Sequence, residues 1–298
     1  MRFIIAAFLA LLLSAKANST CTPPQWSFNR TSTLVQYIAV FSPTANANIT
    51  YGIYLPPEYS STTTRRFPVL YWLHGGASNA SGGEGFVSRA SSAMARGVMP
   101  PAIIILPNGP GMFWTDSNPG LTPYDAPIES VIVNDLIPLI DSTYRTVATR
   151  EGRGIEGFSM GGRGSTRLGL KFAADFGLVS NLAGAVQTLE FFQTANRAGD
   201  IYECVFDSDS VYFDANSPQT HAVDAADYIH LAGLSFRFIV GGNDGGNLRA
   251  NQTFAALLDS LAIPYTFTIV PNVGHCYQCL YDVLGDAAFQ FFADAWGQ

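Results

Sequence analysis

One segment constrains this chain more than any other: a serine enclosed by glycines, Gly157-Phe158-Ser159-Met160-Gly161-Gly162. It follows the short stretch 153–156, which has the pattern of a strand end, and precedes residues 163–172, which have the composition of a packed helix. A serine at such a strand-to-helix turn is typical of a nucleophile elbow, in which the tight turn excludes side chains at Gly157 and Gly161. The segment predicts Ser159 as a nucleophile, against the alternative of a glycine-rich turn that contains serine by chance.

Apolar stretches of strand length alternate with segments of helical spacing along the chain, and this predicts an α/β fold. We expect a mostly parallel central sheet covered by helices on both faces, with an antiparallel pair at its start. Residues 187–232 lack a regular pattern, and we interpret them as a lid-like insertion within a single catalytic domain that spans 18–298. The predicted strands are 34–41, 49–55, 67–73, 102–106, 153–156, 178–186, 236–240 and 265–270, and the predicted helices are 128–144, 163–172, 248–261 and 280–296.

The first 17 residues have the pattern of a cleavable secretory signal. Arg2 precedes an apolar run at 3–13, which is followed by Ala15-Lys16-Ala17. The run is shorter than the roughly 20 residues that span a bilayer. We therefore expect a secreted, extracellular protein that begins near Asn18 and has no membrane anchor.

The chain is acidic, with 16 Lys+Arg against 23 Asp+Glu and a formal charge of −7. Removal of Arg2 and Lys16 with the signal would make this charge −9. Such a surface repels phosphate backbones and anionic lipids, so we expect no nucleic-acid or membrane partner. With 48% hydrophobic and 13% charged residues, the composition suits one large domain with a substantial core.

Four cysteines, Cys21, Cys204, Cys276 and Cys279, predict two disulfides in a secreted chain, although three pairings are open. Structural bonds are favoured over redox chemistry, and the last two cysteines are expected to brace the loop that carries His275. Sequons suggest a glycoprotein with acceptor sites in surface loops, at Asn18, Asn29, Asn48, Asn79 and Asn251.

A serine hydroxyl needs a base within hydrogen-bond reach. Of the four histidines, His74 lies inside the His-Gly-Gly turn, and His221 and His230 lie in or just after the irregular segment. His275 lies on a loop after predicted strand 265–270, at the sheet edge where catalytic groups of parallel sheets collect. We predict His275 as the base and Asp244, directly after strand 236–240, as the acid that orients it. The order Ser, Asp, His is the one expected of folds with such an elbow.

Other acidic residues are open alternatives for the acid, namely Asp207, Asp209, Asp214 and Asp282. The usual interpretation of such residues is surface charge. A calcium loop over 207–214 lacks the spacing of an EF-hand. We expect neither a metal nor an organic cofactor.

An oxyanion hole requires two donors, and the Met160 amide follows the nucleophile directly. The second is predicted at Gly76, with Ala77 as the alternative, because Gly75 and Gly76 permit a close backbone approach after strand 67–73. His74 is then a scaffold residue of this turn. Substrate-binding roles are expected for Trp114 and Tyr124.

The chain resembles the Putative esterase family of α/β-hydrolases over residues 45–295. The resemblance rests on Leu73-His74-Gly75-Gly76, Leu136-Ile137-Pro138, the elbow, Asp244 and Gly274-His275. This family includes feruloyl and acetylxylan esterases of carbohydrate esterase family 1, S-formylglutathione hydrolase and mycolyltransferases. The resemblance implies the α/β-hydrolase fold, a triad of Ser159, Asp244 and His275, and oxyanion amides at Met160 and after His74-Gly75.

Tannase-like feruloyl esterases join cysteines beside the serine and the histidine, but here Phe158 precedes Ser159, so that bridge cannot form. The sequence predicts a secreted serine carboxylic-ester hydrolase that removes feruloyl or acetyl groups from plant cell-wall polysaccharide. An acyltransferase with the same acyl-enzyme and a non-catalytic secreted binding protein are the alternatives. The oligomeric state stays open.

Overall fold

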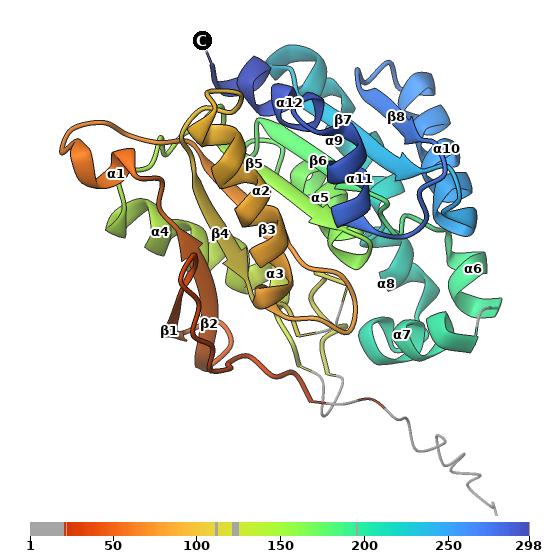
Figure 1. Ribbon diagram of the computed structural model, residues 1–298. Coiled ribbons are helices and arrows are strands. Elements are labelled where there is room, and N and C mark those ends of the chain that lie inside the picture. The colour runs from red at the N-terminus through yellow and green to blue at the C-terminus, as the bar shows by residue number, and fades with distance from the viewer. Residues whose placement is uncertain (1–20, 22, 111–112, 121–124, 195, 298) are drawn as a thin grey trace, which may run out of the picture.

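The computed structural model describes residue 21 and residues 23–110, 113–120, 125–194 and 196–297. Within these residues, eight strands form one sheet in the order β1-β2-β4-β3-β5-β6-β7-β8 (Figure 1). The pairs β1–β2 and β2–β4 are antiparallel and the others are parallel, which confirms the predicted sheet. The strands are β1 Gln36–Ser42, β2 Ala47–Tyr54, β3 Val69–Leu73, β4 Ile103–Pro107, β5 Arg153–Phe158, β6 Leu178–Leu182, β7 Ser235–Gly241 and β8 Thr266–Val270.

Helices cover both faces of this sheet, as the alternation of strand side chains requires. In β3, Tyr71 belongs to one apolar cluster and Trp72 to the other. The first cluster includes residues of α3 Ile128–Ser130, the π-helical segment η2 Val131–Leu136, α4 Ile137–Thr143, α5 Met160–Lys171, α9 Pro218–Ala232 and α10 Gly245–Ser260. The second includes residues of α2 Glu84–Ala95, α11 Tyr277–Leu284 and α12 Ala287–Trp296. The short segments α1 Glu58–Ser61 and η1 Ala80–Gly83 complete this part of the fold.

The segment 187–232 is helical, contrary to the irregular structure expected of it. It contains α6 Leu189–Thr194, α7 Asn196–Phe206, α8 Ser210–Ala215 and α9. The last of these packs against α5, with Ala222 and Ile229 buried in the core. Its start has the usual signals, since Ser217 accepts a hydrogen bond from the Thr220 amide and Pro218 occupies the first turn. Helix α9 is therefore part of the helical layer on this face of the sheet.

Other elements also differ from the sequence-based expectation. The strand expected over 178–186 ends at Leu182, because the chain turns at Ala183 with a φ of 48°. The helix expected over 280–296 is divided at Gly285, whose φ of 53° interrupts α-helical geometry. Helix α2, whose buried face includes Phe86 and Ala90, has no counterpart among the predicted helices.

Two disulfides join the four cysteines, Cys21 to Cys204 and Cys276 to Cys279, and this resolves the open pairing. The first ties the N-terminal segment to α7, and the second lies at the start of α11. Asn251 is fully buried in α10, which contradicts its expected place in a surface loop. The predicted signal and the sequon at Asn18 lie outside the described residues.

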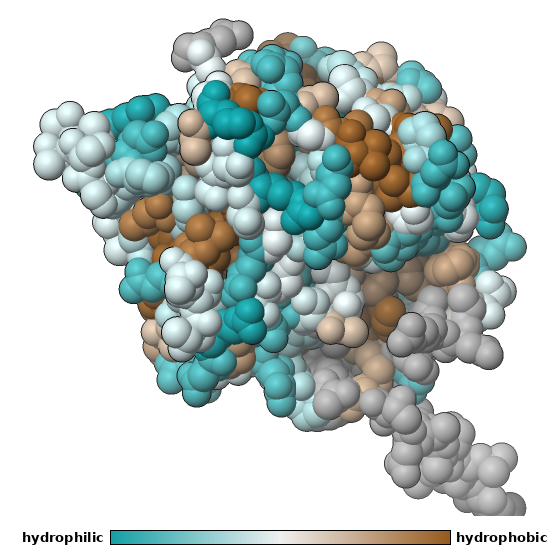
Figure 2. Space-filling model, in the orientation of Figure 1, coloured by the Kyte–Doolittle hydropathy of each residue, from teal (hydrophilic) through white to brown (hydrophobic). Residues whose placement is uncertain are grey.

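Large apolar side chains are exposed at scattered positions, among them Phe41, Ile269 and Val283. On the face shown in Figure 2, hydrophobic surface forms separate patches among polar residues, a distribution usual for protein surfaces. Within the described ranges, every helix is too short or too polar to cross a lipid bilayer.

A buried ion pair links the strand that carries the elbow to its neighbours. Glu156 of β5 is fully buried and accepts hydrogen bonds from Trp72 Nε1 at 3.1 Å and from the Tyr281 hydroxyl at 2.7 Å. Its other oxygen lies 2.9 Å from Arg237 Nη2 on β7. Arg237 Nε also donates to Ser180 Oγ on β6, at 2.8 Å. One carboxylate thus connects three strands and α11.

We predict that Glu156→Ala lowers the free energy of unfolding by about 3–5 kcal/mol, because it leaves the buried Arg237 guanidinium without its carboxylate. The exposed pair Arg96–Asp286 provides a matched control, and Arg96→Ala is expected to cost less than about 1 kcal/mol. Urea unfolding of the two variants measures both values. Equal losses would contradict the central role of Glu156.

Candidate active site

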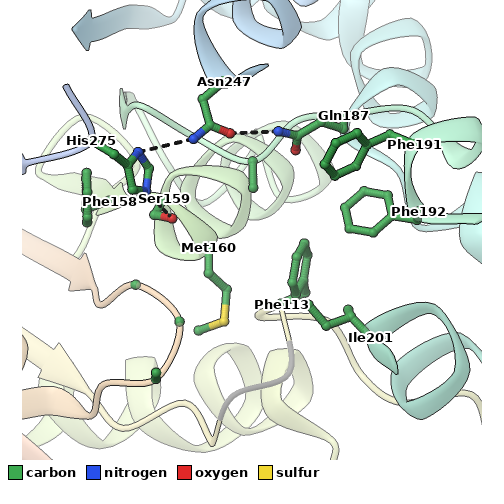
Figure 3. A pocket seen from close by; sticks show the side chains of 14 residues that line it. Phe113, Phe158, Ser159, Met160, Gln187, Phe191, Phe192, Ile201, Asn247 and His275 are labelled. Atoms are coloured by element: carbon green, nitrogen blue, oxygen red, sulfur yellow. Dashed lines mark hydrogen bonds between the residues drawn. The ribbon is translucent and has the colours of Figure 1, made fainter. Parts of the chain in front are cut away.

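A pocket of about 570 Å³ opens at the carboxyl ends of the parallel strands (Figure 3). Its walls come from the turn after β3, the elbow after β5, the loop after β6, helices α6 and α7, the start of α10 and the loop after β8. The lining residues are Gly75, Gly76, Ala77, Phe113, Phe158, Ser159, Met160, Ala185, Gln187, Phe191, Phe192, Ile201, Asn247 and His275.

Ser159 occupies a strained turn between β5 and α5, with φ 58° and ψ −114°. The glycines around it are required by close backbone contacts. A Cβ on Gly157 would lie 2.2 Å from the Gly161 carbonyl oxygen, and a Cβ on Gly161 would lie 2.0 Å from the Leu73 carbonyl oxygen. The sequence-based expectation for both glycines thus has a direct steric cause.

The structure brings the three predicted residues of the triad together. Ser159 Oγ lies 2.8 Å from His275 Nε2, and His275 Nδ1 lies 2.8 Å from Asp244 Oδ2. Because the ionised carboxylate can only accept, Nδ1 carries the proton and Nε2 is free to accept the serine proton. Asp244 is buried, whereas 38% of the His275 side chain is exposed. This arrangement can activate Ser159 for nucleophilic attack.

The alternative acidic residues lie elsewhere. Asp209 accepts the amide hydrogens of Val211 and Tyr212 at the start of α8. Asp282 pairs with Arg89 at 2.7 Å. No cluster of three or more metal-ligating side chains occurs in the part of the chain that the structure describes, the 207–214 segment included.

Asn247, which the sequence analysis did not identify, completes the hydrogen bonding of the acid. Its Nδ2 lies 3.2 Å from Asp244 Oδ1 and its Oδ1 accepts from Gln187 Nε2 at 2.7 Å. In the sequence, Asn247 follows Asp244 by three residues. Asp244 is the N-cap of α10 and Asn247 lies in its first turn, so this spacing brings the two side chains together.

Aromatic rings hold the loop that carries His275. The Phe158 ring packs against the imidazole with a centroid distance of 4.6 Å and against Tyr277 at 5.4 Å. The Tyr277 hydroxyl donates to the Gly82 carbonyl at 2.7 Å. Cys276, which follows His275, caps α11 and is bonded to Cys279. Phe158 therefore contacts the base from the position beside the nucleophile.

The predicted oxyanion donors lie on either side of Ser159. Met160 is the first residue of α5, so its amide has no acceptor within the helix. Across the pocket, a Cβ on Gly75 would lie 3.5 Å from Ser159 Cβ, which places the turn after β3 beside the nucleophile. Both Gly76 and Ala77 line the pocket, so this turn offers two amides for the second position.

His74 braces this turn, as its predicted scaffold role requires. The buried ring accepts the Gly109 amide hydrogen at Nε2, at 3.2 Å, so Nδ1 carries the proton and donates to the Gly75 carbonyl at 2.8 Å. Burial lowers the pKa of His74 to about 4, which keeps the ring neutral. His221 is buried in α9, and His230 contacts the Leu261 carbonyl.

The expected pocket role of Trp114 is wrong. Its side chain is 1% exposed and lies beneath the turn, where Nε1 donates to the His74 carbonyl at 3.1 Å. A large ring beside Gly109 and Gly164 fills the core rather than the cavity. Tyr124 lies outside the described residues. The aromatic lining comes instead from Phe113, Phe191 and Phe192.

A parallel sheet with an elbow serine after β5, an acid after β7 and a histidine after β8 defines an α/β-hydrolase. The chain belongs to the family described as Putative esterase, whose model matches residues 42–263. This confirms the family resemblance. The matched range contains Ser159 and Asp244 and ends before His275.

Two curated relatives and one solved structure show the same likeness. An esterase of Mycobacterium tuberculosis is 30% identical over 158 residues, which are 52% of this chain and 33% of the relative. An endo-1,4-beta-xylanase/feruloyl esterase of Xylanibacter ruminicola is 27% identical over 158 residues, which are 50% of this chain and 21% of the relative. The chain thus spans a third or less of these relatives. A ferulic acid esterase structure has a TM-score of 0.71 at 22% identity, covering 88% of this chain and 98% of that one, and so shares the fold.

We predict that Gly161→Ala lowers the free energy of unfolding by about 3 kcal/mol, because the new methyl group overlaps the Leu73 carbonyl. Gly76→Ala is the matched control, since a Cβ there meets no atom within 4 Å. Urea unfolding measures both, and a Gly161→Ala variant as stable as the control would contradict the steric account.

The buried His74 makes the stability of the fold depend on pH. The unfolded chain binds a proton at His74 near pH 6.5, whereas the folded chain resists it down to about pH 4. Stability from the neutral ring is therefore complete above pH 6.5 and is lost as the pH falls toward 4, by about 3 kcal/mol in total. We expect His74→Gln to flatten this part of the stability curve.

Urea unfolding at intervals between pH 4 and pH 7 measures the effect. Burial also lowers the pKa of His221, to about 3, so the variant retains part of the slope. His230→Gln, at an exposed position, is the control. Parallel curves for the wild type and His74→Gln would contradict the prediction.

Proposed function

We propose that this protein is a secreted serine carboxylic-ester hydrolase that releases feruloyl groups, with acetyl groups as the alternative, from plant cell-wall polysaccharide. The observation on which the proposal rests is the continuous contact from Ser159 through His275 to Asp244, each step 2.8 Å long. Membership of the Putative esterase family supports ester chemistry at this site.

In the proposed mechanism, Ser159 Oγ attacks the ester carbonyl while His275 Nε2 takes its proton. The charge that develops on the carbonyl oxygen meets the Met160 amide and an amide of the Gly76–Ala77 turn. Protonated His275 then gives its proton to the departing alcohol, which leaves an acyl-serine. Water, deprotonated by His275, then attacks the acyl carbonyl. The bond from this carbonyl to Ser159 Oγ breaks, and His275 returns the proton to Oγ as the acid leaves. Asp244 holds the imidazole in one tautomer through both steps.

The pocket supports an aromatic acyl group over acetyl. Its lining contains Phe113, Phe191 and Phe192, and its volume of about 570 Å³ far exceeds that of an acetyl group. The names of the Xylanibacter ruminicola relative and of the similar structure include feruloyl and ferulic acid esterase. The leader at 1–17 and two disulfides support secretion.

We predict that Ser159→Ala lowers kcat for methyl ferulate at least about a thousandfold while the far-UV circular dichroism stays unchanged, because the substitution removes the nucleophilic hydroxyl and leaves the rest of the turn in place. Ser78→Ala removes an exposed hydroxyl from the nearby turn and serves as the control. The panel includes nitrophenyl acetate, methyl ferulate and acetylated xylan, with liberated acid as the readout.

Serine-dependent release of ferulate supports the whole proposal. Release from nitrophenyl acetate alone supports the mechanism and contradicts the feruloyl assignment. Activity retained in Ser159→Ala contradicts the mechanism. Transfer of the acyl group to an added sugar, in preference to water, would favour the acyltransferase.

A further inference from the structure

The amide of Gln187 has an oxygen without a hydrogen-bond partner among the described residues. This atom, Oε1, is buried, and the whole residue is only 9% exposed although it lines the pocket. In Figure 3 the nitrogen end of the amide points to Asn247 and the oxygen end points away from it, beside the phenyl rings. A buried acceptor without a donor is unfavourable, so a ligand that supplies a donor would be stabilised there.

The orientation of this amide follows from the charge on Asp244. An amide group beside a carboxylate oxygen must present its nitrogen, so Asn247 Nδ2 faces Asp244 Oδ1 at 3.2 Å. Asn247 Oδ1 then faces Gln187, and a nitrogen must meet it at 2.7 Å. The carboxylate of the triad thus fixes two amides in succession. Gln187 is left with an acceptor and no donor at its other end.

The backbone around Gln187 is also fixed. The buried guanidinium of Arg163 lies 3.4 Å from the Gln187 carbonyl through Nη1 and packs over the Phe113 and Phe192 rings, 5.6 and 5.4 Å from their centroids. The rings and Gln187 therefore form one wall, in which Gln187 Oε1 is the acceptor without a partner beside the phenyl rings. Such a wall suits a flat apolar ring that carries one hydroxyl group.

We propose that Gln187 determines specificity by accepting a hydrogen bond from a hydroxyl group on the aromatic ring of the acyl group. The inference rests on the proposed function. The acyl side is assigned to this wall because its phenyl rings suit an aromatic acyl group, whereas a polysaccharide alcohol is polar and stays in contact with solvent. A ring without a hydroxyl group cannot donate a hydrogen bond to this acceptor. The site therefore discriminates between two esters that differ only by the hydroxyl group.

The test compares kcat/KM for methyl 4-hydroxycinnamate and 3-hydroxycinnamate with that for methyl cinnamate. In the wild type we expect at least one hydroxylated ester to be favoured about tenfold. In Gln187→Leu the ratio is expected to fall to about one, because leucine offers no acceptor. Any effect of this variant on His275 through Asn247 acts on all esters alike and cancels in the ratio.

Gln219→Leu is the matched control, because the Gln219 amide donates to the Val186 carbonyl and does not line the pocket. Its ratio should equal that of the wild type. Equal rates for the three esters in the wild type, or a ratio unchanged in Gln187→Leu, would overturn the inference even if Ser159-dependent hydrolysis is intact.

Calorimetric binding of the same esters to Ser159→Ala separates this inference from the proposed function, because it needs no turnover. A preference of about tenfold for a hydroxylated ester, lost when Gln187→Leu is added, supports the acceptor role whatever the enzyme's rate. Equal affinities overturn it. If hydrolysis fails but the hydroxylated ester binds preferentially, the proposed hydrolase function is rejected and the acceptor role of Gln187 is retained.

Discussion

The site depends on the close approach of helix α5 to the ends of β3 and β5. Gly161 allows this approach because its Cα faces the Leu73 carbonyl with no room for a methyl group. Two hydrogen bonds then hold the strained serine, from its amide to the Leu182 carbonyl at 2.9 Å and from the Ala185 amide to its carbonyl at 3.0 Å. The positive φ of Ser159 is thus sustained by contacts at the end of β6 and, through Gly161, at the end of β3, and the nucleophile is fixed before any substrate binds.

His275 is held differently, because it lies on a loop after the edge strand β8. No second strand lies beside β8 on its outer edge within the described sheet. The imidazole depends instead on Asp244, on the ring of Phe158 and on the helix that starts at Cys276. Phe158 is the residue directly before the nucleophile. An aromatic contact there orients the base without a covalent bond, while Cys276 pairs locally.

The sequence predicted the features that depend on residues close together in the chain. The elbow is specified by glycines adjacent in the chain, and Asp244 and His275 follow apolar strands directly, so their shared sheet edge could be inferred. Gln187 and Asn247 are 60 residues apart and meet only in three dimensions. The pocket role expected of Trp114 is wrong because its residue type suits a pocket and a core equally. Only the three-dimensional contacts of its ring with Gly109 and Gly164 show that it belongs to the core. Helix α9 has clear capping residues in the sequence, Ser217 and Pro218. The aromatic residues before it have no regular spacing, so the sequence does not show where the inserted segment ends and the core helix begins.

The aromatic wall of the pocket is not part of the sheet and needs its own attachment. Helix α7 supplies Ile201 to the wall and carries Cys204, which is bonded to Cys21. The segment after Cys21 is in turn fixed to the sheet, since the Thr50 amide and Asn108 Nδ2 both donate to the Trp26 carbonyl at 3.0 Å. One disulfide therefore connects the pocket wall to β2 through the N-terminal segment, and the other stabilises the loop of the base. Both covalent links serve the parts of the site that the sheet does not position, and the nucleophile, which the sheet does position, has neither.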